Sequence, residues 1–156
     1  MLNIGGLEQG VVIDHIPAGA GMKIYQYMGL EKMDCTVALI KNATSHLMGR
    51  KDIIKIEGPL RVNLDILGVI DPRITVNIIA HNEIIEKRHV ELPETVTNVI
   101  QCTNPRCISS IEQELPQIFR LTDREHGIYR CIYCEQEFNE FKKLKQKLQI
   151  ETAKKQ

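Results

Sequence analysis

The sequence predicts an α+β fold, in which one antiparallel sheet with two helices precedes a small all-β domain. Two observations predict this arrangement. Short apolar segments alternate between strand-like and helix-like spacing up to about residue 92, and four of the five cysteines follow that point. The chain has 156 residues, a length that fits one domain or two small ones.

The first part of the chain contains six predicted elements in the order β-α-β-β-α-β. They are a strand at 10–17, a helix at 19–30, strands at 35–42 and 50–58, a helix at 61–72, and a β-branched segment at 73–92 that forms one bent strand or two. This order is typical of the ferredoxin-like fold, a split β-α-β arrangement with both helices on one face of the sheet.

The segment "LPETVTN" at 92–98 predicts a domain boundary, because it combines Pro93 with a polar cluster. We therefore expect a first domain at 1–93 and a second at 94–156. The final stretch, 141–156, carries six Lys and one Glu, with apolar residues three and four apart. This pattern predicts a basic, weakly amphipathic C-terminal tail.

The composition argues against several classes of protein. The 20 basic and 20 acidic side chains cancel, aromatic residues make up 4% and Trp is absent, so a polynucleotide-binding protein is disfavoured. The apolar runs are too short to span a bilayer, and the first ten residues lack the regions of a secretion signal. We expect a cytoplasmic chain with reduced thiols and no membrane contact.

The cysteines Cys102, Cys107, Cys131 and Cys134 form the pattern C-x4-C-x23-C-x2-C. Four thiolates on two tight turns suit one tetrahedral Zn²⁺, and the Asn104-Pro105 pair shapes the first turn. Such a site leaves no open coordination position, which indicates a structural metal. A second domain of about sixty residues buries little apolar surface, and bound zinc adds folding free energy.

Other interpretations of the cysteines stay open at this point. They include four unrelated buried cysteines, a dithiol redox centre at "CIYC" and an iron–sulfur cluster. Arg106 and Arg130, each next to a ligand, are expected to balance the negative charge of the thiolates. Cys35 stands alone and is expected to be a small buried apolar residue.

Polar residues on the predicted strands suggest a nucleotide site in the first domain. Lys51 and Lys55 are four apart and share one face of a strand, which lets both reach one ligand. Lysines suit phosphates, and Asp14 suits the donors of a ribose or a base. The competing interpretation is an ordinary solvated face of lysines with Asp14 and His15 at a strand end.

Five stretches together resemble the regulatory chain of aspartate carbamoyltransferase over about residues 4 to 138. They are "GVVIDHIPAGAG", "MGRKDIIKIE", "ITVNIIAHNEIIEK", "LPETVTNVIQCTNPRCIS" and "YRCIYCEQEF". The resemblance implies a ferredoxin-like allosteric domain that binds CTP as inhibitor and ATP as competing effector, in pyrimidine biosynthesis. It also implies a zinc domain that docks on the catalytic chains, and regulatory chains that dimerise and link catalytic trimers.

The resemblance places the family's nucleotide contacts on residues of both halves of the predicted sheet: Ile4, Leu7, Val12, Asp14, His15, Lys51, Lys55, Asn77, Ile79, Ile84 and Lys87. The sequence departs from the family at three positions. Gly5 stands where the family has an acidic residue, Asn82 where it has a Tyr, and His89 where it has an Arg, with Arg88 as a possible replacement.

No catalytic constellation is present in the sequence. It has no Ser-His-Asp order and no G-x-x-x-x-G-K-[ST] loop, and the predicted metal has no open position. We therefore expect a regulatory subunit and not an enzyme. The alternative is a zinc-ribbon protein that binds nucleic acid through its basic tail.

Overall fold

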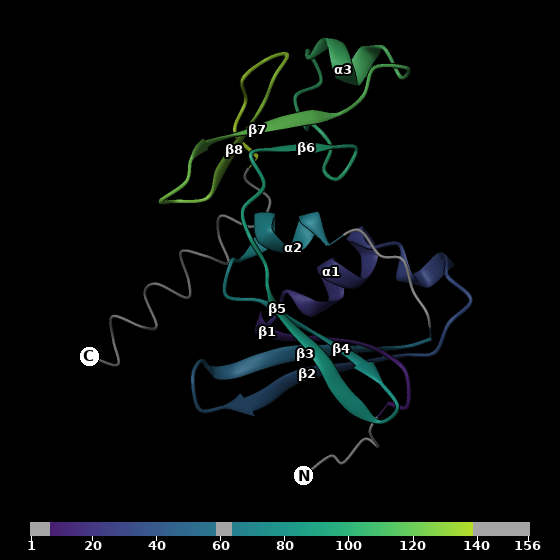
Figure 1. Ribbon diagram of the computed structural model, residues 1–156. Coiled ribbons are helices and arrows are strands. Elements are labelled where there is room, and N and C mark those ends of the chain that lie inside the picture. Colours follow the sequence, from purple (N-terminus) through teal and green to yellow (C-terminus); the bar gives the residue numbers. More distant parts are fainter. Residues whose placement is uncertain (1–6, 59–63, 139–156) are drawn as a thin grey trace. The chain divides into compact units, whose positions relative to one another are not determined.

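The computed structural model describes residues 7–58 and 64–138 (Figure 1). The expectations for Ile4, Gly5 and the tail at 141–156 lie outside these residues. By its contacts the described chain forms two compact units. The first holds residues 7–58, 64 and 73–90, and the second holds residues 65–72 and 91–138.

The first unit contains one five-stranded antiparallel sheet in the order β2-β3-β1-β4-β5. Its strands are β1 (Gly10–Pro17), β2 (Val37–Ser45), β3 (Gly49–Glu57), β4 (Thr75–Ala80) and β5 (Glu83–His89). The order of the first four strands is that of the predicted ferredoxin-like sheet. The segment at 73–92 forms two strands, joined by a turn in which His81 and Asn82 both have positive φ.

Helix α1 (Gly21–Tyr27) covers one face of this sheet, followed by the short 3-10 helix η1 (Leu30–Lys32) (Figure 1). The predicted helix at 19–30 is shorter in the structure because Gly29 takes a left-handed conformation with φ 67°. The covered face buries the apolar side chains Ile13, Ile16, Ile54, Ile56 and Val76, and α1 contributes the buried Ile24. We call the opposite face, which carries Val12, Lys55 and Asn77, the open face.

Two β-bulges interrupt the sheet on either side of β3. In β1, Asp14 and His15 together oppose Ile53, and His15 has φ 57°. In β2 the register shifts between Ile40 and Ala43, opposite Asp52. The β1 bulge lets both Ile13 and Ile16 point into the core, since the extra residue changes the alternation of side chains.

Asp52 is a buried carboxylate, 1% exposed, that joins three backbone segments. Its Oδ2 accepts hydrogen bonds from the amides of Gly19 and Gly21, both at 3.0 Å. Its Oδ1 accepts a hydrogen bond of 2.8 Å from the amide of Asn42 in the β2 bulge. Asp52 therefore holds the first turn of α1 and the bulge of β2 against β3.

The second unit contains a three-stranded antiparallel sheet in the order β6-β7-β8. Its elements are α2 (Asp65–Ile70), β6 (Thr95–Thr97), α3 (Ile108–Ile111), β7 (Ile118–Asp123) and β8 (Ile128–Cys131). Phe119 and Tyr129 are almost fully buried in its core, and the ring of Phe138 meets that of Phe119 edge-on at 6.0 Å. The predicted β domain thus also contains the four-residue helix α3.

Helix α2 groups with the second unit by its contacts, although sequence order places it in the first predicted domain. A Cβ added to Gly68 would collide with the carbonyl oxygen of Glu91, so helix and linker lie in close contact. The boundary near residue 93 stays a prediction. Within the described residues, no helix is long and apolar enough to cross a membrane.

Candidate functional sites

The sulfurs of Cys102, Cys107, Cys131 and Cys134 all lie within 4.8 Å of one another. Cys102 Sγ is 3.6 Å from Cys134 Sγ, and Cys107 Sγ is 3.7 Å from Cys131 Sγ. None of the four forms a disulfide. Four sulfurs placed 2.3 Å from a tetrahedral zinc ion are about 3.8 Å apart, so the observed pairs fit one Zn²⁺.

Asn104 organises the first cysteine turn. Its carbonyl oxygen accepts hydrogen bonds from the Cys107 amide at 3.0 Å and from the Ser110 hydroxyl at 2.7 Å. Its side-chain Oδ1 accepts a hydrogen bond of 3.1 Å from the amide of Arg106. These bonds turn the chain so that Cys102 and Cys107 bring their sulfurs to the same point.

Two glutamines and a tight turn support the rest of the site. Gln117 Oε1 accepts from the amide of Cys102 at 2.9 Å, and Gln117 Nε2 donates to the carbonyl of Ser109 at 2.9 Å. Gln136 Nε2 donates to Thr103 Oγ1 at 2.9 Å. In the second cysteine turn, the amide of Glu135, which has φ 64°, donates to the carbonyl of Cys131 at 2.8 Å. The sequence analysis did not identify these supporting residues.

The thiols differ in acidity. Burial raises the pKa of Cys102 to about 12. Burial also acts to raise the pKa of Cys107, but hydrogen bonds with Ser109, Cys131 and Cys134 together outweigh it and lower that pKa to about 7. Metal binding requires the thiolate form, so a metal ion must displace the proton of Cys102.

The structure also places Arg106, Arg130 and Cys35. Arg106 makes no side-chain hydrogen bond or ion pair within the described part of the chain. Arg130 donates to the carbonyl of Glu135 at 3.1 Å and lies 3.9 Å from the carboxylate of Glu137. The balance of thiolate charge by these two arginines stays a prediction. Cys35 is half-buried and not fully buried as expected.

Four residues predicted for the nucleotide site form one row across the open face. Strand pairing places Lys55 opposite Val12, Val12 opposite Asn77, and Asn77 opposite Lys87. Directly opposed residues in antiparallel strands point to the same face. The side-chain Oδ1 of Asn77 is buried and has no hydrogen-bond partner within the described residues, which is unusual for a buried oxygen.

One end of the open face is polar. Lys51 Nζ lies 2.9 Å from Asp14 Oδ1, and both side chains are only partly exposed, at 17% and 20%. Next to them, His15 Nδ1 lies 2.9 Å from the hydroxyl of Thr75, a buried residue that the sequence analysis did not identify. The β1 bulge thus brings Asp14 and His15 to the same region as Lys51.

The other end of the open face is more apolar and includes Gly10, which has no side chain. Gly10 lies opposite both Glu57 and Ile79, and Ile79 lies opposite Ile84, which is 60% exposed. Leu7 precedes this row and is half-buried. This end of the open face therefore presents apolar side chains beside charged groups.

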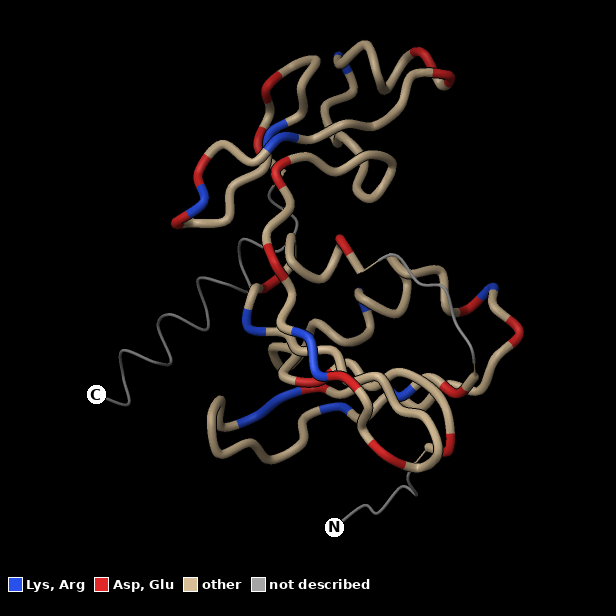
Figure 2. Tube along the Cα trace, in the orientation of Figure 1, with Lys and Arg blue, Asp and Glu red and all other residues tan. Residues whose placement is uncertain are grey.

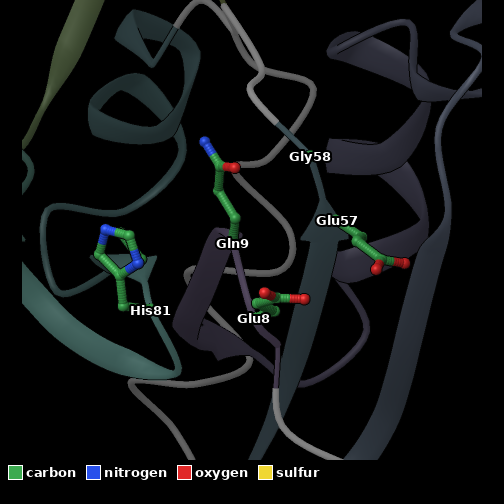
Figure 3. Close-up of a pocket in the computed structure, with 6 residues that line it drawn as sticks. Glu8, Gln9, Glu57, Gly58 and His81 are labelled. Carbon is green, nitrogen blue, oxygen red and sulfur yellow. The ribbon is translucent and has the colours of Figure 1, made fainter.

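A pocket of about 440 Å³ lies where β1 begins, β3 ends and β4 turns into β5 (Figure 3). Its lining residues are Glu8, Gln9, Glu57, Gly58, Ala80 and His81. Two of them, Glu8 and Glu57, bring carboxylates to the pocket. Glu57 belongs to the row of Gly10 and Ile79, so the pocket lies at the end of the sheet where this row lies.

Comparisons with known proteins agree over both units. Residues 2–91 match the family model "Aspartate carbamoyltransferase regulatory chain, allosteric domain", and residues 94–143 match the model of its metal binding domain. The chain belongs to the family of aspartate carbamoyltransferase regulatory chains. The regulatory chain of Clostridium botulinum strain Hall is 53% identical over 136 residues, which cover 87% of this chain and 93% of the relative.

More distant regulatory chains show the same extent of similarity. That of Clostridium acetobutylicum is 48% identical over 136 residues, covering 87% of this chain and 93% of the relative. That of Bifidobacterium longum is 39% identical over 136 residues, covering 87% of this chain and 98% of the relative. As a regulatory chain the protein is the non-catalytic subunit, and catalysis belongs to the separate catalytic chain.

The structure places the residues at two of the departures from the family pattern. Asn82 occupies a left-handed position of the β4–β5 turn, with φ 65°, a conformation that asparagine tolerates well. Arg88 pairs with Val76, so it points away from the open face, and its guanidinium binds Glu86 at 2.7 and 3.0 Å. His89, opposite Thr75, lies on the open face, and the replacement of the family arginine by Arg88 stays a prediction.

Proposed function

We propose that the open face binds CTP and ATP as competing allosteric effectors, and that the chain thereby regulates the catalytic chains in the first committed step of pyrimidine biosynthesis. The observation that carries this proposal is the row of Lys55, Val12, Asn77 and Lys87, with the unpaired Oδ1 of Asn77 in its centre. A buried acceptor without a partner is suited to a donor on a ligand.

The distribution of charge along the open face supports a nucleotide. Lys51, His15 and Lys87 offer donors for phosphate and ribose oxygens, and lysine binds phosphate as a point charge. Ile79 and Ile84 offer an apolar surface for the base. A ligand with an anionic end and a flat apolar end matches both regions.

The pocket beyond Gly10 supports a base that carries an amino group (Figure 3). The carboxylates of Glu8 and Glu57 accept hydrogen bonds and cannot donate them when ionised. The exocyclic amino groups of cytosine and adenine are donors, whereas the carbonyl at the same position of uracil is an acceptor. This chemistry favours CTP and ATP over UTP.

The metal-binding unit is proposed to hold one structural Zn²⁺ and to attach the regulatory chain to the catalytic chains. Ile108 and Ile132 follow ligand cysteines directly and are 49% and 45% exposed, which leaves apolar side chains beside the metal site for a partner. By resemblance to the family, we further propose that two regulatory chains pair, and that the protein works in the cytoplasm, where the thiols remain reduced.

Titration calorimetry of the purified regulatory chain with CTP and ATP tests the nucleotide site. We expect saturable heat with both, and competition between them at one site. The complex with the catalytic chains provides the second measurement. If CTP lowers the affinity for an active-site bisubstrate analogue, the analogue must lower the affinity for CTP by the same factor. Equal CTP affinity with and without the analogue would show binding without regulation.

The alternative of a zinc-ribbon nucleic-acid binder is not favoured, since both units match the regulatory-chain family. A polynucleotide-binding assay over a range of salt concentrations separates the two functions. Tight, salt-dependent binding of DNA or RNA together with no response to CTP would support the alternative.

A further inference from the structure

Two arginines face each other on the outer side of the small sheet. Arg120 in β7 pairs directly with Arg130 in β8. The alternate residues Phe119, Tyr129 and Cys131 are buried, so both arginines point outward, and both are exposed. Figure 2 shows the two basic positions side by side on β7 and β8. Like charges in directly opposed positions destabilise an antiparallel pair.

The acidic side chains nearby do not balance the positive charges of both Arg120 and Arg130. Arg130 has Glu137, whose Oε2 lies 3.9 Å from its Nη2, and it donates to the carbonyl of Glu135. The side chain of Arg120 makes no hydrogen bond or ion pair within the described residues. In this part of the chain, Arg120 thus has no carboxylate partner that would offset the repulsion between the two guanidinium groups.

A pocket of about 380 Å³ lies beside Arg120. It is lined by Glu94, Thr95, Arg120, Leu121, Thr122 and Arg124. Arg124 donates to the carbonyl of Leu92 at 3.2 Å, whereas the side chain of Arg120 has no partner within the described residues. Glu94 is the single acidic residue of the lining and forms no ion pair with Arg120.

Apolar side chains continue this surface. Ile118 lies two residues before Arg120 on the same side of β7, and the amide of Ile132 donates to the carbonyl of Ile118 at 3.1 Å. Ile132 is 45% exposed. We call the surface of Arg120, Arg130, Ile118, Ile132 and Thr95 the arginine face. A cationic centre next to exposed apolar side chains is typical of a protein interface.

We propose that the arginine face docks an acidic segment of the catalytic chain, with the guanidinium of Arg120 donating to a carboxylate of that partner. This inference rests on the proposed assembly with catalytic chains. The repulsion between Arg120 and Arg130 lowers the stability of the free regulatory chain. A carboxylate of the partner neutralises this charge on docking. A carboxylate matches the planar, two-pronged donor geometry of arginine and supplies the charge that the described chain does not.

The proposal predicts effects of opposite sign on stability and on assembly. Arg120→Gln removes the repulsion, and Arg120→Glu replaces it by attraction to Arg130. Each variant is expected to raise the unfolding temperature of the free, zinc-loaded regulatory chain by roughly 1–5 °C. Each is also expected to weaken binding of the catalytic subunit about ten- to hundredfold, with Arg120→Glu the more severe.

Lys32→Gln is the matched control for net charge, because Lys32 is exposed in the other unit. It should change neither measurement. Binding of the catalytic subunit by the wild-type chain should weaken as salt is added, and the Arg120→Gln variant should show a smaller salt dependence.

Several outcomes would overturn the proposal. Unchanged assembly with either Arg120 variant would show that the pair is only an uncompensated repulsion. A lower unfolding temperature together with lost assembly would make Arg120 a structural residue. Weaker CTP binding with normal assembly would identify a nucleotide phosphate as the occupant. Failure of the wild-type chain to bind the catalytic subunit would instead refute the proposed function itself.

Discussion

Lys51 in β3 and Asp14 in the bulge of β1 form an ion pair of 2.9 Å on the open face. The bulge is what brings them together, because it adds a residue to β1 opposite Ile53. In the proposed nucleotide site, Lys51 is one of the groups that a phosphate would engage, in competition with Asp14.

We therefore expect Lys51→Gln to weaken CTP and ATP alike. Both ligands carry the triphosphate, and loss of a charge-assisted hydrogen bond reduces affinity about ten- to hundredfold. Calorimetric titration of the folded variant measures the change, with Lys32→Gln as a control of equal charge. Normal affinity for both nucleotides would remove Lys51 from the site.

A different substitution should change the selectivity for the base. Glu57→Gln replaces an acceptor-only carboxylate by an amide that both donates and accepts. We expect the preference for CTP over UTP to fall by about tenfold, the factor that corresponds to 1.4 kcal/mol, mainly through weaker CTP binding. The measurement is a pair of dissociation constants. An unchanged ratio would place the base away from the pocket of Glu8 and Glu57.

Asp52 should be essential for the stability of the first unit. Asp52→Ala leaves the amides of Gly19, Gly21 and Asn42 without their acceptor in a buried position, and we expect a loss of at least about 3 kcal/mol in the free energy of unfolding. Asp52→Asn keeps one acceptor oxygen and should lose less. Urea unfolding followed by circular dichroism gives both values; equal stability of wild type and Asp52→Ala would contradict the described hydrogen bonds.

The metal-binding unit should require its metal. Cys131→Ser removes one of four sulfurs and should reduce the zinc content of the purified chain from about one equivalent to well below that value. The folding of the second unit should be lost with it, because metal binding supplies folding free energy. Elemental analysis and chelator titration measure the two effects. Cys35→Ser is the control, since Cys35 lies outside the cluster.

His126 and Asp123 form an exposed pair whose titration can be followed directly. The hydrogen bond of 2.7 Å to Asp123 raises the pKa of His126, and the same bond lowers the pKa of Asp123. The contribution of His126 to stability is complete below its unfolded pKa and is lost as pH rises through its folded pKa. That of Asp123 is complete above its unfolded pKa and is lost as pH falls through its folded pKa.

The pair therefore stabilises the β7–β8 turn most between about pH 4 and 6.5, the unperturbed values of the two side chains. NMR titration should place the pKa of His126 above its ordinary value, and Asp123→Asn should lower it. A titration of His126 that is the same in both proteins would show that the pair does not form in solution.

The fold and the metal site could be predicted from the sequence because both depend on residues that are close together along the chain. Strand and helix periodicity, and stops such as Gly29, depend on neighbours along the chain, and the spacing of Cys102, Cys107, Cys131 and Cys134 is set by two short turns. The α1 helix is shorter than expected because the left-handed Gly29 stops it and only one 3-10 turn follows.

The features that the sequence did not reveal depend on pairing across strands. The partners of Asp52 lie 10 to 33 residues away, and Thr75 is 60 residues from His15. The direction of Arg88 follows from its register with Val76, and the opposition of Arg120 and Arg130 follows from the β7–β8 register. Side-chain period alone does not fix a register, so these relationships required the structure.

The bulge at Asp14 and His15 also constrains how the length of this strand can evolve. Side chains in a regular strand alternate with a period of two, so Ile13 and Ile16, which are three residues apart, share the core face only because one extra residue lies between them. Loss of one residue at the bulge would restore the regular period, and both isoleucines would still face the core. The open face would instead lose one of the two polar side chains that the bulge crowds opposite Ile53. We therefore expect a shortened descendant of this chain to keep its packing and to lose part of the polar end of the open face.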